Sequence, residues 1–186
     1  MSATPHPETE DALLAGAPRR ATWGLMLRSP LHLLALGAGS GLSPVAPGTV
    51  GTAAAWGVFL LLQPHLDDLQ WAALLLAGLG VGWWACTRTA QAMRSADPGA
   101  IVWDEWLAMW LVLWVIAPAG WDLQLAAFAL FRLLDAAKPG PVGWADRLFK
   151  AREGQAPGWR QGFGILFDDL VAALCTLILL ALWRVA

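Results

Sequence analysis

Five carboxylate side chains lie within otherwise apolar stretches of this sequence, each near the same end of its stretch: Asp104, Glu105, Asp135, Asp168 and Asp169. A carboxylate inside a membrane loses hydration worth several kcal/mol, so it persists only when it is paired, bound to a metal or facing a wet cavity. Neighbouring residues on a helix are about 100° apart, so both members of an adjacent pair could border one cavity. Their hard oxygen ligands suit Mg²⁺ better than zinc. We therefore predict a metal-dependent active site at one membrane face.

The composition is that of a small polytopic membrane protein. Hydrophobic residues make up 58% of the 186 and charged residues only 14%, against roughly 25% charged in soluble domains. The thirteen Trp residues fit a membrane–water boundary, although several could pack between helices. A formal net charge of −2 argues against a nucleic-acid partner, which needs a basic patch.

The apolar segments predict an all-α bundle with about five membrane-associated helices. Most segments approach the roughly 17–25 residues that a spanning helix needs. The first is interrupted by seven Gly and Pro residues between positions 37 and 51, so we expect a short helix, a loop and a second helix from about Thr49. Residues 1–28 are predicted to form a disordered cytoplasmic tail and residues 29–186 a membrane-embedded domain. The segments are 31–63, 71–87, 101–117, 121–136 and 166–185.

The distribution of Lys and Arg predicts the orientation in a membrane. Positive charges precede the first segment, follow the second and lie between the fourth and fifth, whereas loops 64–70 and 118–121 carry none. By the positive-inside rule the N-terminus is cytoplasmic and the C-terminus external. The five carboxylates then all lie at the cytoplasmic side, where Asp104 opens the third helix, Asp135 closes the fourth and Asp168 opens the fifth.

Cationic side chains accompany one of these carboxylates. Arg132, Asp135 and Lys138 recur every three residues and fall on one stripe of a helix. Two cations beside a carboxylate could clamp a phosphate next to a metal. Alternatively, Arg132 and Lys138 only neutralise Asp135 or reach lipid headgroups. The adjacent Asp146 and Arg147 have the same ambiguity, because a solvated ion pair would give the same pattern.

Residues 39–52 (GSGLSPVAPGTVGT) offer free backbone amides and hydroxyl groups, including those of Ser43 and Thr49, ahead of a helix N-terminus. Such a segment could cradle an anion. It is not a Walker sequence, because it lacks the Lys, and Gly-rich breaks also serve close helix packing. Gly162-Phe163-Gly164 likewise permits a tight approach of two elements or a turn.

Four separated motifs occur between about Pro30 and Ala173. They are Gly39–Pro44 followed by Pro47-Gly48-Thr49, then Val102–Glu105, then Phe131–Asp135 with Lys138-Pro139, and finally Gly164–Asp169. In this order they resemble the bacterial phosphatidylglycerophosphatase A family, and the Asp146-Arg147 pair matches it as well. The sequence departs from the family pattern at Gly140, where Trp is expected, and in a longer segment 151–160.

The resemblance implies a Mg²⁺-dependent phosphatase of the bacterial inner membrane that converts phosphatidylglycerophosphate to phosphatidylglycerol and inorganic phosphate in phospholipid biosynthesis. On this hypothesis Mg²⁺ is held by four carboxylates, and Asp135 orients or deprotonates the attacking water. A phospho-aspartate intermediate is the alternative route. The expected metal ligands are Asp104, Glu105, Asp168 and Asp169, and the expected phosphate contacts are Arg132, Lys138, Arg147, Thr49 and Ser43.

Three other functions compete with this interpretation. A phosphatase acting on another lipid phosphate is the nearest. A small ion- or proton-coupled transporter would place carboxylates at several membrane depths, whereas here they gather at one face with Arg and Lys. An assembly factor would use its ion pairs only to fix helix registry. The sequence does not indicate an oligomeric state.

Overall fold

The computed structural model describes residues 17–150 and 156–185, and all of their regular structure is helical, which confirms the all-α prediction for this part of the chain. Of the predicted disordered tail, residues 1–16 lie outside the described residues. Residues 17–28 contain a short helix that the Thr22 hydroxyl caps. In chain order the elements are α2 (Trp23–Met26), α3 (Pro30–Ala35), η1 (Gly37–Leu42), α4 (Pro47–Leu62), η2 (Gln63–His65), α5 (Asp68–Met93), α6 (Trp103–Ile116), α7 (Trp121–Ala137), α8 (Pro141–Phe149) and α9 (Trp159–Val185).

The first apolar segment is divided as predicted into a short helix, an irregular stretch and a longer helix. Ser29 caps α3 with its hydroxyl oxygen. Within η1, Ala38 and Gly39 have φ angles of 51° and 103°, which no continuous right-handed helix contains. Helix α4 then begins at Pro47, after a left-handed Ala46. The turn before α4 therefore separates two helices that the hydropathy pattern joins.

Helix α6 forms the centre of the bundle and packs against α4, α5, α7 and α9. Ten of its fourteen residues are buried. The indole N–H groups of Trp103 and Trp110 donate to the carbonyls of Gly78 and Ala55 at 3.0 and 2.8 Å. These Trp side chains thus satisfy their polar group inside the core. Others, such as Trp121, are exposed as a boundary residue would be.

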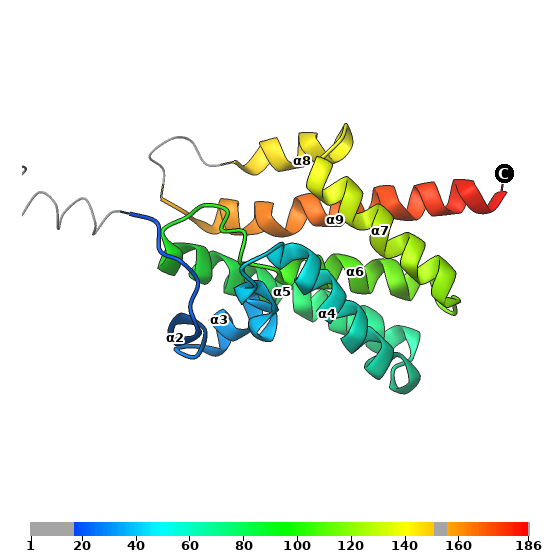
Figure 1. The fold of residues 1–186 in the computed structure, drawn as a ribbon, viewed down its shortest axis with the longest axis horizontal. Coiled ribbons are helices and arrows are strands. Elements are labelled where there is room, and N and C mark those ends of the chain that lie inside the picture. Colours follow the sequence, from blue (N-terminus) through cyan, green and yellow to red (C-terminus); the bar gives the residue numbers. More distant parts are fainter. Residues whose placement is uncertain (1–16, 151–155, 186) are drawn as a thin grey trace, which may run out of the picture.

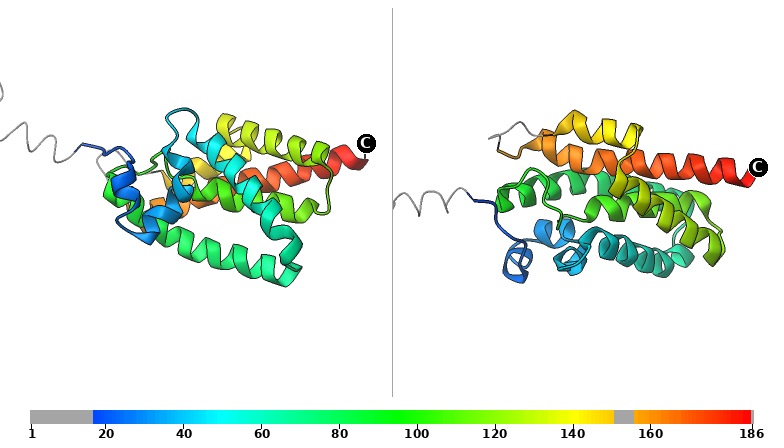
Figure 2. Two further views of the ribbon diagram at one scale, coloured as in Figure 1. Left: turned by 60° about the horizontal axis from the view of Figure 1, so that its bottom comes forward. Right: turned by 45° about the horizontal axis from the view of Figure 1, so that its top comes forward.

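Helices α5 and α9 run antiparallel along most of the long axis, whereas α4, α6 and α7 are shorter and occupy the half nearer the C-terminal end of α9 (Figures 1 and 2). Helix α8 returns along the first part of α9. The prediction that Asp168 opens the last helix is wrong, since α9 begins at Trp159, about 14 Å earlier at roughly 1.5 Å per residue. The Asp168-Asp169 pair instead occupies the tenth and eleventh residues of this 27-residue helix.

Two helices among the described residues, α5 and α9, are long and apolar enough to cross a membrane, with mean hydropathies of 1.4 and 2.4 over their best 18-residue windows. Helices α4, α6 and α7 have 16, 14 and 17 residues, or about 21–26 Å of length. That is shorter than a hydrocarbon core of roughly 30 Å. Five complete crossings therefore stay a prediction.

Candidate active site

Three carboxylates meet where α6 packs on α9. One oxygen each from Asp104, Glu105 and Asp169 lies within 4.8 Å of the other two. Each of these side chains also has a buried oxygen with no hydrogen-bond partner among the described residues. An unpartnered buried oxygen is costly, and like charges at this separation repel by roughly 3 kcal/mol per pair at an effective dielectric constant of about 20. A bound cation would offset both costs, and we call these three residues the carboxylate cluster.

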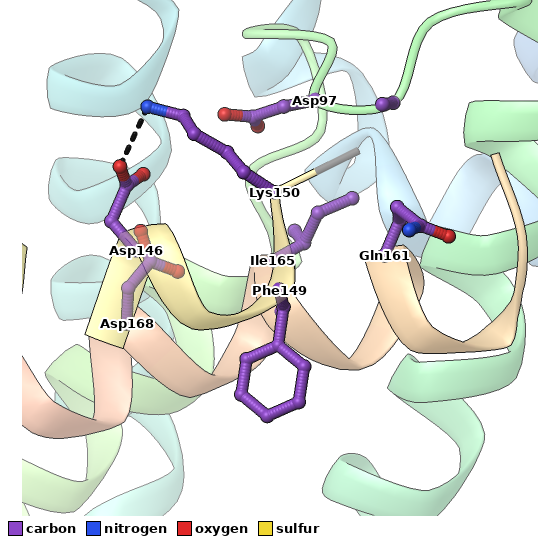
Figure 3. Close-up of a pocket in the computed structure, with 9 residues that line it drawn as sticks. Asp97, Asp146, Phe149, Lys150, Gln161, Ile165 and Asp168 are labelled. Carbon is purple, nitrogen blue, oxygen red and sulfur yellow. Dashed lines mark hydrogen bonds and ion pairs between the residues drawn. The ribbon is translucent and has the colours of Figure 1, made fainter. Parts of the chain in front are cut away.

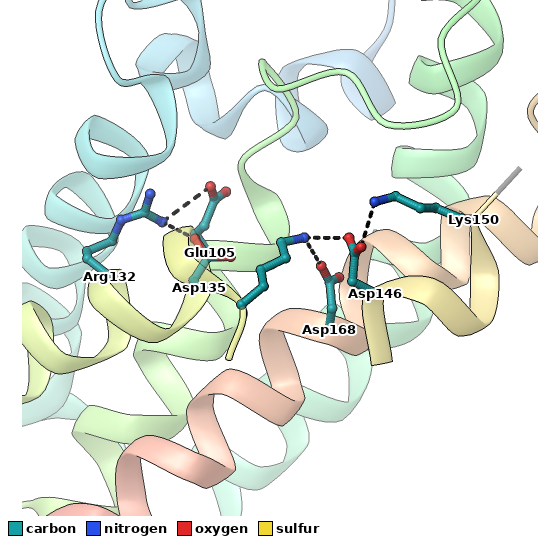
Figure 4. A network of polar contacts seen from close by, with 7 residues as sticks. Glu105, Arg132, Asp135, Asp146, Lys150 and Asp168 are labelled. Carbon is teal, nitrogen blue, oxygen red and sulfur yellow. Dashed lines mark hydrogen bonds and ion pairs between the residues drawn. The ribbon is translucent and has the colours of Figure 1, made fainter. Parts of the chain in front are cut away.

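The guanidinium of Arg132 joins the carboxylate cluster from α7 (Figure 4). Its Nη1 donates to Asp135 Oδ2 at 2.6 Å and lies 3.6 Å from Glu105 Oε1. The same nitrogen lies 3.4 Å from the hydroxyl of Thr52 on α4. Among the described residues no other cation forms an ion pair with Glu105 or Asp135. The cluster together with Asp135 therefore keeps an excess of negative charge.

Asp168 belongs to a second, charge-balanced network beside the carboxylate cluster (Figure 4). Lys138 Nζ donates to Asp168 Oδ2 at 2.5 Å and to Asp146 Oδ1 at 2.7 Å, and Lys150 Nζ donates to Asp146 Oδ2 at 2.7 Å. Lys138 reaches both carboxylates because it ends α7 in a left-handed conformation, with φ of 46°. Its ammonium group thus connects α7 to α8 and α9.

The pKa values of this second network follow from its hydrogen bonds. Burial alone would lower the pKa of Lys138, but the hydrogen bonds from its ammonium group to Asp146 and Asp168 raise that pKa above the ordinary value. Burial alone would raise the pKa of Asp146, but donors from Lys138 and Lys150 hold it below the ordinary value. Both groups stay charged at neutral pH.

The N-terminus of α4 faces the carboxylate cluster at close range. A Cβ atom at Gly48 would overlap Glu105 Oε1 and Arg132 Nη2, so a larger residue there would displace the charged ends of these two side chains. No side chain in the described part of the chain caps this helix end, and Pro47 in the first turn has no N–H. The amides of Gly48 and Thr49 are therefore available to an anion, which the helix dipole also attracts.

The side chains of the other predicted phosphate contacts form no hydrogen bond or ion pair with the carboxylate cluster among the described residues. The hydroxyl of Thr49 is in the first turn of α4, and Thr49 is exposed. Ser43 donates to the carbonyl of Val45 at 2.8 Å. Arg147 is exposed on α8 and forms no ion pair with any described residue. Of the predicted phosphate contacts, Arg132 therefore lies beside the carboxylate cluster, whereas Lys138 belongs to the neighbouring ion-pair network.

The sequence pattern did not indicate a role for Thr52, and it left Asp146 as one member of an ambiguous pair with Arg147. Thr52 is fully buried, donates to the carbonyl of Gly48 at 2.8 Å and lies against Arg132. Its place one turn after Gly48 is the signal that could have revealed it. Asp146 forms ion pairs with Lys138 and Lys150, and its spacing of four residues from Lys150 is a helical ion-pair pattern.

Comparisons with known proteins identify the family. The family model described as phosphatidylglycerophosphatase A matches residues 33–184. The protein of that name from Escherichia coli (strain K12) is 39% identical over 150 residues, which cover 81% of both chains. The one from Haemophilus influenzae is 36% identical over 154 residues, covering 83% of this chain and 88% of its own.

A third relative carries a different name. The "Putative phosphatidylinositol-3-phosphatase" of Bacteroides thetaiotaomicron is 32% identical over 160 residues, covering 82% of this chain and 92% of its own. No solved structure gives a significant match. The matches extend over most of the chain and include every helix from α4 to α8. The resemblance seen in the sequence motifs is therefore confirmed, and the chain belongs to the phosphatidylglycerophosphatase A family.

Proposed function

We propose that this protein hydrolyses the terminal phosphate monoester of phosphatidylglycerophosphate, releasing phosphatidylglycerol and inorganic phosphate, and that it needs Mg²⁺ to do so. The observation that carries the proposal is the carboxylate cluster with its buried, unpartnered oxygens beside one guanidinium and an uncapped helix N-terminus. Excess negative charge suits a divalent cation, and the guanidinium and free amides suit phosphate oxygens. The names of the two phosphatidylglycerophosphatase relatives support this substrate.

The donor set of the carboxylate cluster fits Mg²⁺. Asp104, Glu105 and Asp169 offer only oxygen, which hard cations prefer, and none of the three oxygens left unpartnered has a competing donor among the described residues. When bound, Mg²⁺ would neutralise phosphate oxygens and make a coordinated water more acidic. Asp168, the fourth predicted ligand, is paired with Lys138 in this structure, so its role as a ligand stays a prediction.

The protein's own residues supply the orientation of the phosphate and the movement of the proton. Arg132 and the amides of Gly48 and Thr49 hold the phosphate oxygens and stabilise the charge that develops on them. Asp135, whose Oδ2 accepts from Arg132, takes the proton of a water molecule as its oxygen attacks phosphorus. The bond from phosphorus to the glycerol oxygen then breaks, and the proton passes to that oxygen.

A lipid substrate explains why the site lies at the ends of α4, α6 and α7. The phosphate of a lipid stays at the headgroup level while its acyl chains remain in the bilayer. Two apolar helices, one of which carries Asp168 and Asp169, are consistent with a chain embedded in the bacterial inner membrane. We propose that the site faces the cytoplasm. The name of the Bacteroides thetaiotaomicron relative makes phosphatidylinositol 3-phosphate the second candidate substrate.

The proposed function is tested by phosphate release from phosphatidylglycerophosphate in detergent micelles, with Mg²⁺ and with excess chelator. We expect release that the chelator abolishes and that Asp169→Asn reduces by roughly 100-fold or more. The matched control is Asp122→Asn, which should retain full activity. Asp122 is exposed in the first turn of α7, at the opposite end of that helix from Asp135.

The outcomes separate the parts of the proposal. Chelator-resistant release would rule out the metal requirement. Full activity of Asp169→Asn would rule out the carboxylate cluster as the site. Phosphate release from phosphatidylinositol 3-phosphate but not from phosphatidylglycerophosphate would make phosphatidylinositol 3-phosphate the substrate.

A further inference from the structure

Helices α2 and α3 carry large apolar side chains that no described residue covers. Trp23 and Leu27, one helical turn apart, are 64% and 73% exposed, and Leu33 on α3 is 40% exposed. Figure 1 shows both helices on the outside of the bundle, beyond the first turn of α4. Moving such side chains from water into an apolar phase is favourable. We call these three residues the α2–α3 patch.

Buried contacts hold the α2–α3 patch in place. Met26, which lies between its two members on α2, is only 3% exposed. A Cβ atom at Gly39 of η1 would contact both the Met26 sulfur and the outer edge of the Trp23 ring. On α3, the imidazole Nδ1 of His32 lies 2.9 Å from the hydroxyl of the buried Thr89 on α5. The exposed side chains thus stand on a fixed support.

The C-terminal end of α3 lies beside the start of α6, where the carboxylate cluster begins. The Val102 amide, directly before the first turn of α6, donates to the Ala35 carbonyl at 3.0 Å. Asp104 of the cluster follows two residues later. The proposed substrate brings its phosphate to the cluster at the level of the lipid headgroups. On that proposal, α3 lies at the same level of the membrane.

An apolar cavity opens between α3 and α6, next to the α2–α3 patch. Its volume is about 240 Å³, and every residue that lines it is apolar or a glycine. Leu33 of the patch forms one wall, and Trp103 and Trp106 form another. The indole N–H groups of these two residues donate elsewhere, to the Gly78 carbonyl at 3.0 Å and the Ser40 hydroxyl at 3.4 Å. Such a lining suits part of an acyl chain.

The charge around the α2–α3 patch indicates the kind of surface that it meets. Residues 17–66 contain Arg19, Arg20 and Arg28 and no Asp or Glu. All three Arg residues are exposed, and none forms an ion pair with any described residue. Arg28 directly follows Leu27 of the patch. Exposed apolar side chains next to unpaired cations are typical of a segment that lies on an anionic lipid surface.

We propose that α2 and α3 form an anchor at the cytoplasmic surface of the membrane, in which the α2–α3 patch enters the lipid and Arg28 binds the phosphate of an anionic phospholipid. The anchor goes beyond the proposed function and rests on it only for the level of the site. Through the Val102–Ala35 hydrogen bond, it holds the first turn of α6 at the headgroups from which a lipid substrate enters.

The first test is quenching of the fluorophore NBD by a phosphatidylcholine whose acyl chain carries a nitroxide near the headgroup. NBD is attached to Leu27→Cys in the full-length protein in phosphatidylcholine nanodiscs, after Cys86→Ala and Cys175→Ser have removed the native thiols. Because the position 27 side chain lies in lipid, the nitroxide lipid should quench NBD strongly and dissolved acrylamide should quench it weakly.

The matched control is NBD on Asp97→Cys in the same background. Asp97 is exposed in the loop that joins α5 to α6 (Figure 3). At this position acrylamide should quench strongly and the nitroxide lipid weakly.

The second test measures the preference for an anionic lipid. At equal mole fraction, nitroxide-labelled phosphatidylserine should quench NBD at position 27 more strongly than phosphatidylcholine with the same label. Arg28→Gln should lower this preference roughly 5-fold, the contribution of one Arg next to an anionic lipid. Arg160→Gln removes the same charge from a residue that donates to the Leu148 carbonyl on α8, and it should leave the preference unchanged.

Each contrary result overturns a defined part of the anchor. Strong quenching by acrylamide at position 27 would place the α2–α3 patch in water. Weak quenching by both the nitroxide lipid and acrylamide would show that protein covers the patch. Equal quenching by the two nitroxide lipids, or a preference that survives in Arg28→Gln, would overturn the role of Arg28. None of these readouts needs phosphate release, so a failure of the anchor is distinguishable from a failure of the proposed function.

Discussion

Arg132 lies in α7 and Lys138 caps its C-terminal end six residues later, yet the two side chains meet different surroundings. Arg132 faces Glu105 and Asp135, where negative charge is in excess, so its guanidinium has donors left for a phosphate. Lys138 is shared by Asp146 and Asp168 at 2.7 and 2.5 Å, which uses much of its ammonium group. The two cations that the sequence placed on one stripe are thus inferred to differ in role: Arg132 binds substrate, and Lys138 holds α7, α8 and α9 together.

Replacing Asp146 tests that structural role through its pH dependence. Because the folded-state pKa of Asp146 is lowered, its stabilising contribution is present above the unfolded pKa of about 3.9 and is lost as pH falls through the lower folded value. Asp146→Asn should therefore lower the Tm by about 2–4 °C at pH 7, and the difference from wild type should shrink below about pH 4. Thermal unfolding in detergent at several pH values measures this, with Asp122→Asn as the control. A constant difference across that range would contradict the assignment.

At the scale of elements, Gly162 of α9 decides how closely that helix approaches α5. A Cβ at Gly162 would overlap the side chain and Cα of Thr87 on α5, which is fully buried. Gly162→Ala should therefore lower the free energy of unfolding by about 1–3 kcal/mol, despite the better helix propensity of alanine.

Gly80→Ala provides the matched control, because no heavy atom lies within 4 Å of the added methyl group. It should be neutral or stabilise the protein by up to about 1 kcal/mol. Thermal unfolding of both variants in the same detergent compares them. If Gly162→Ala were as stable as Gly80→Ala, close packing would not be the reason for the glycine.

These elements also show why part of the site could be predicted and part could not. The positions of Asp104 and Asp135 near helix ends follow from local signals, since apolar periodicity begins or stops beside them. The start of α9 does not follow, because Gly162 resembles a turn residue unless its contact with Thr87 is known. Likewise, whether Lys138 meets a phosphate or a carboxylate depends on how α8 folds back on α9, which local sequence does not determine.

For the whole molecule, the short helices indicate where a bilayer would lie. Helices α4, α6 and α7 occupy the half of the molecule near the C-terminal end of α9 (Figure 1). Asp104 and Glu105 of the carboxylate cluster lie in the first turn of α6, and Glu105 lies against Gly48 at the start of α4 and Arg132 near the end of α7. The part of α9 after Asp169 adds about 24 Å, similar to those helices. A bilayer around this half would place the cluster at the headgroup level, and in the proposed orientation the opposite half, with α2 and α3, would face the cytoplasm.

This placement predicts which residues are reachable from outside the cell. Arg20→Cys and Asp122→Cys put a thiol at exposed positions at opposite ends of the molecule, once Cys86→Ala and Cys175→Ser have removed the native thiols. A membrane-impermeant maleimide should label the Asp122→Cys thiol in intact cells and the Arg20→Cys thiol only after permeabilisation. The reverse pattern would put the carboxylate cluster on the outer face. Because a lipid phosphate reaches the cluster only from the leaflet on that side, the labelling pattern also fixes which leaflet supplies the substrate.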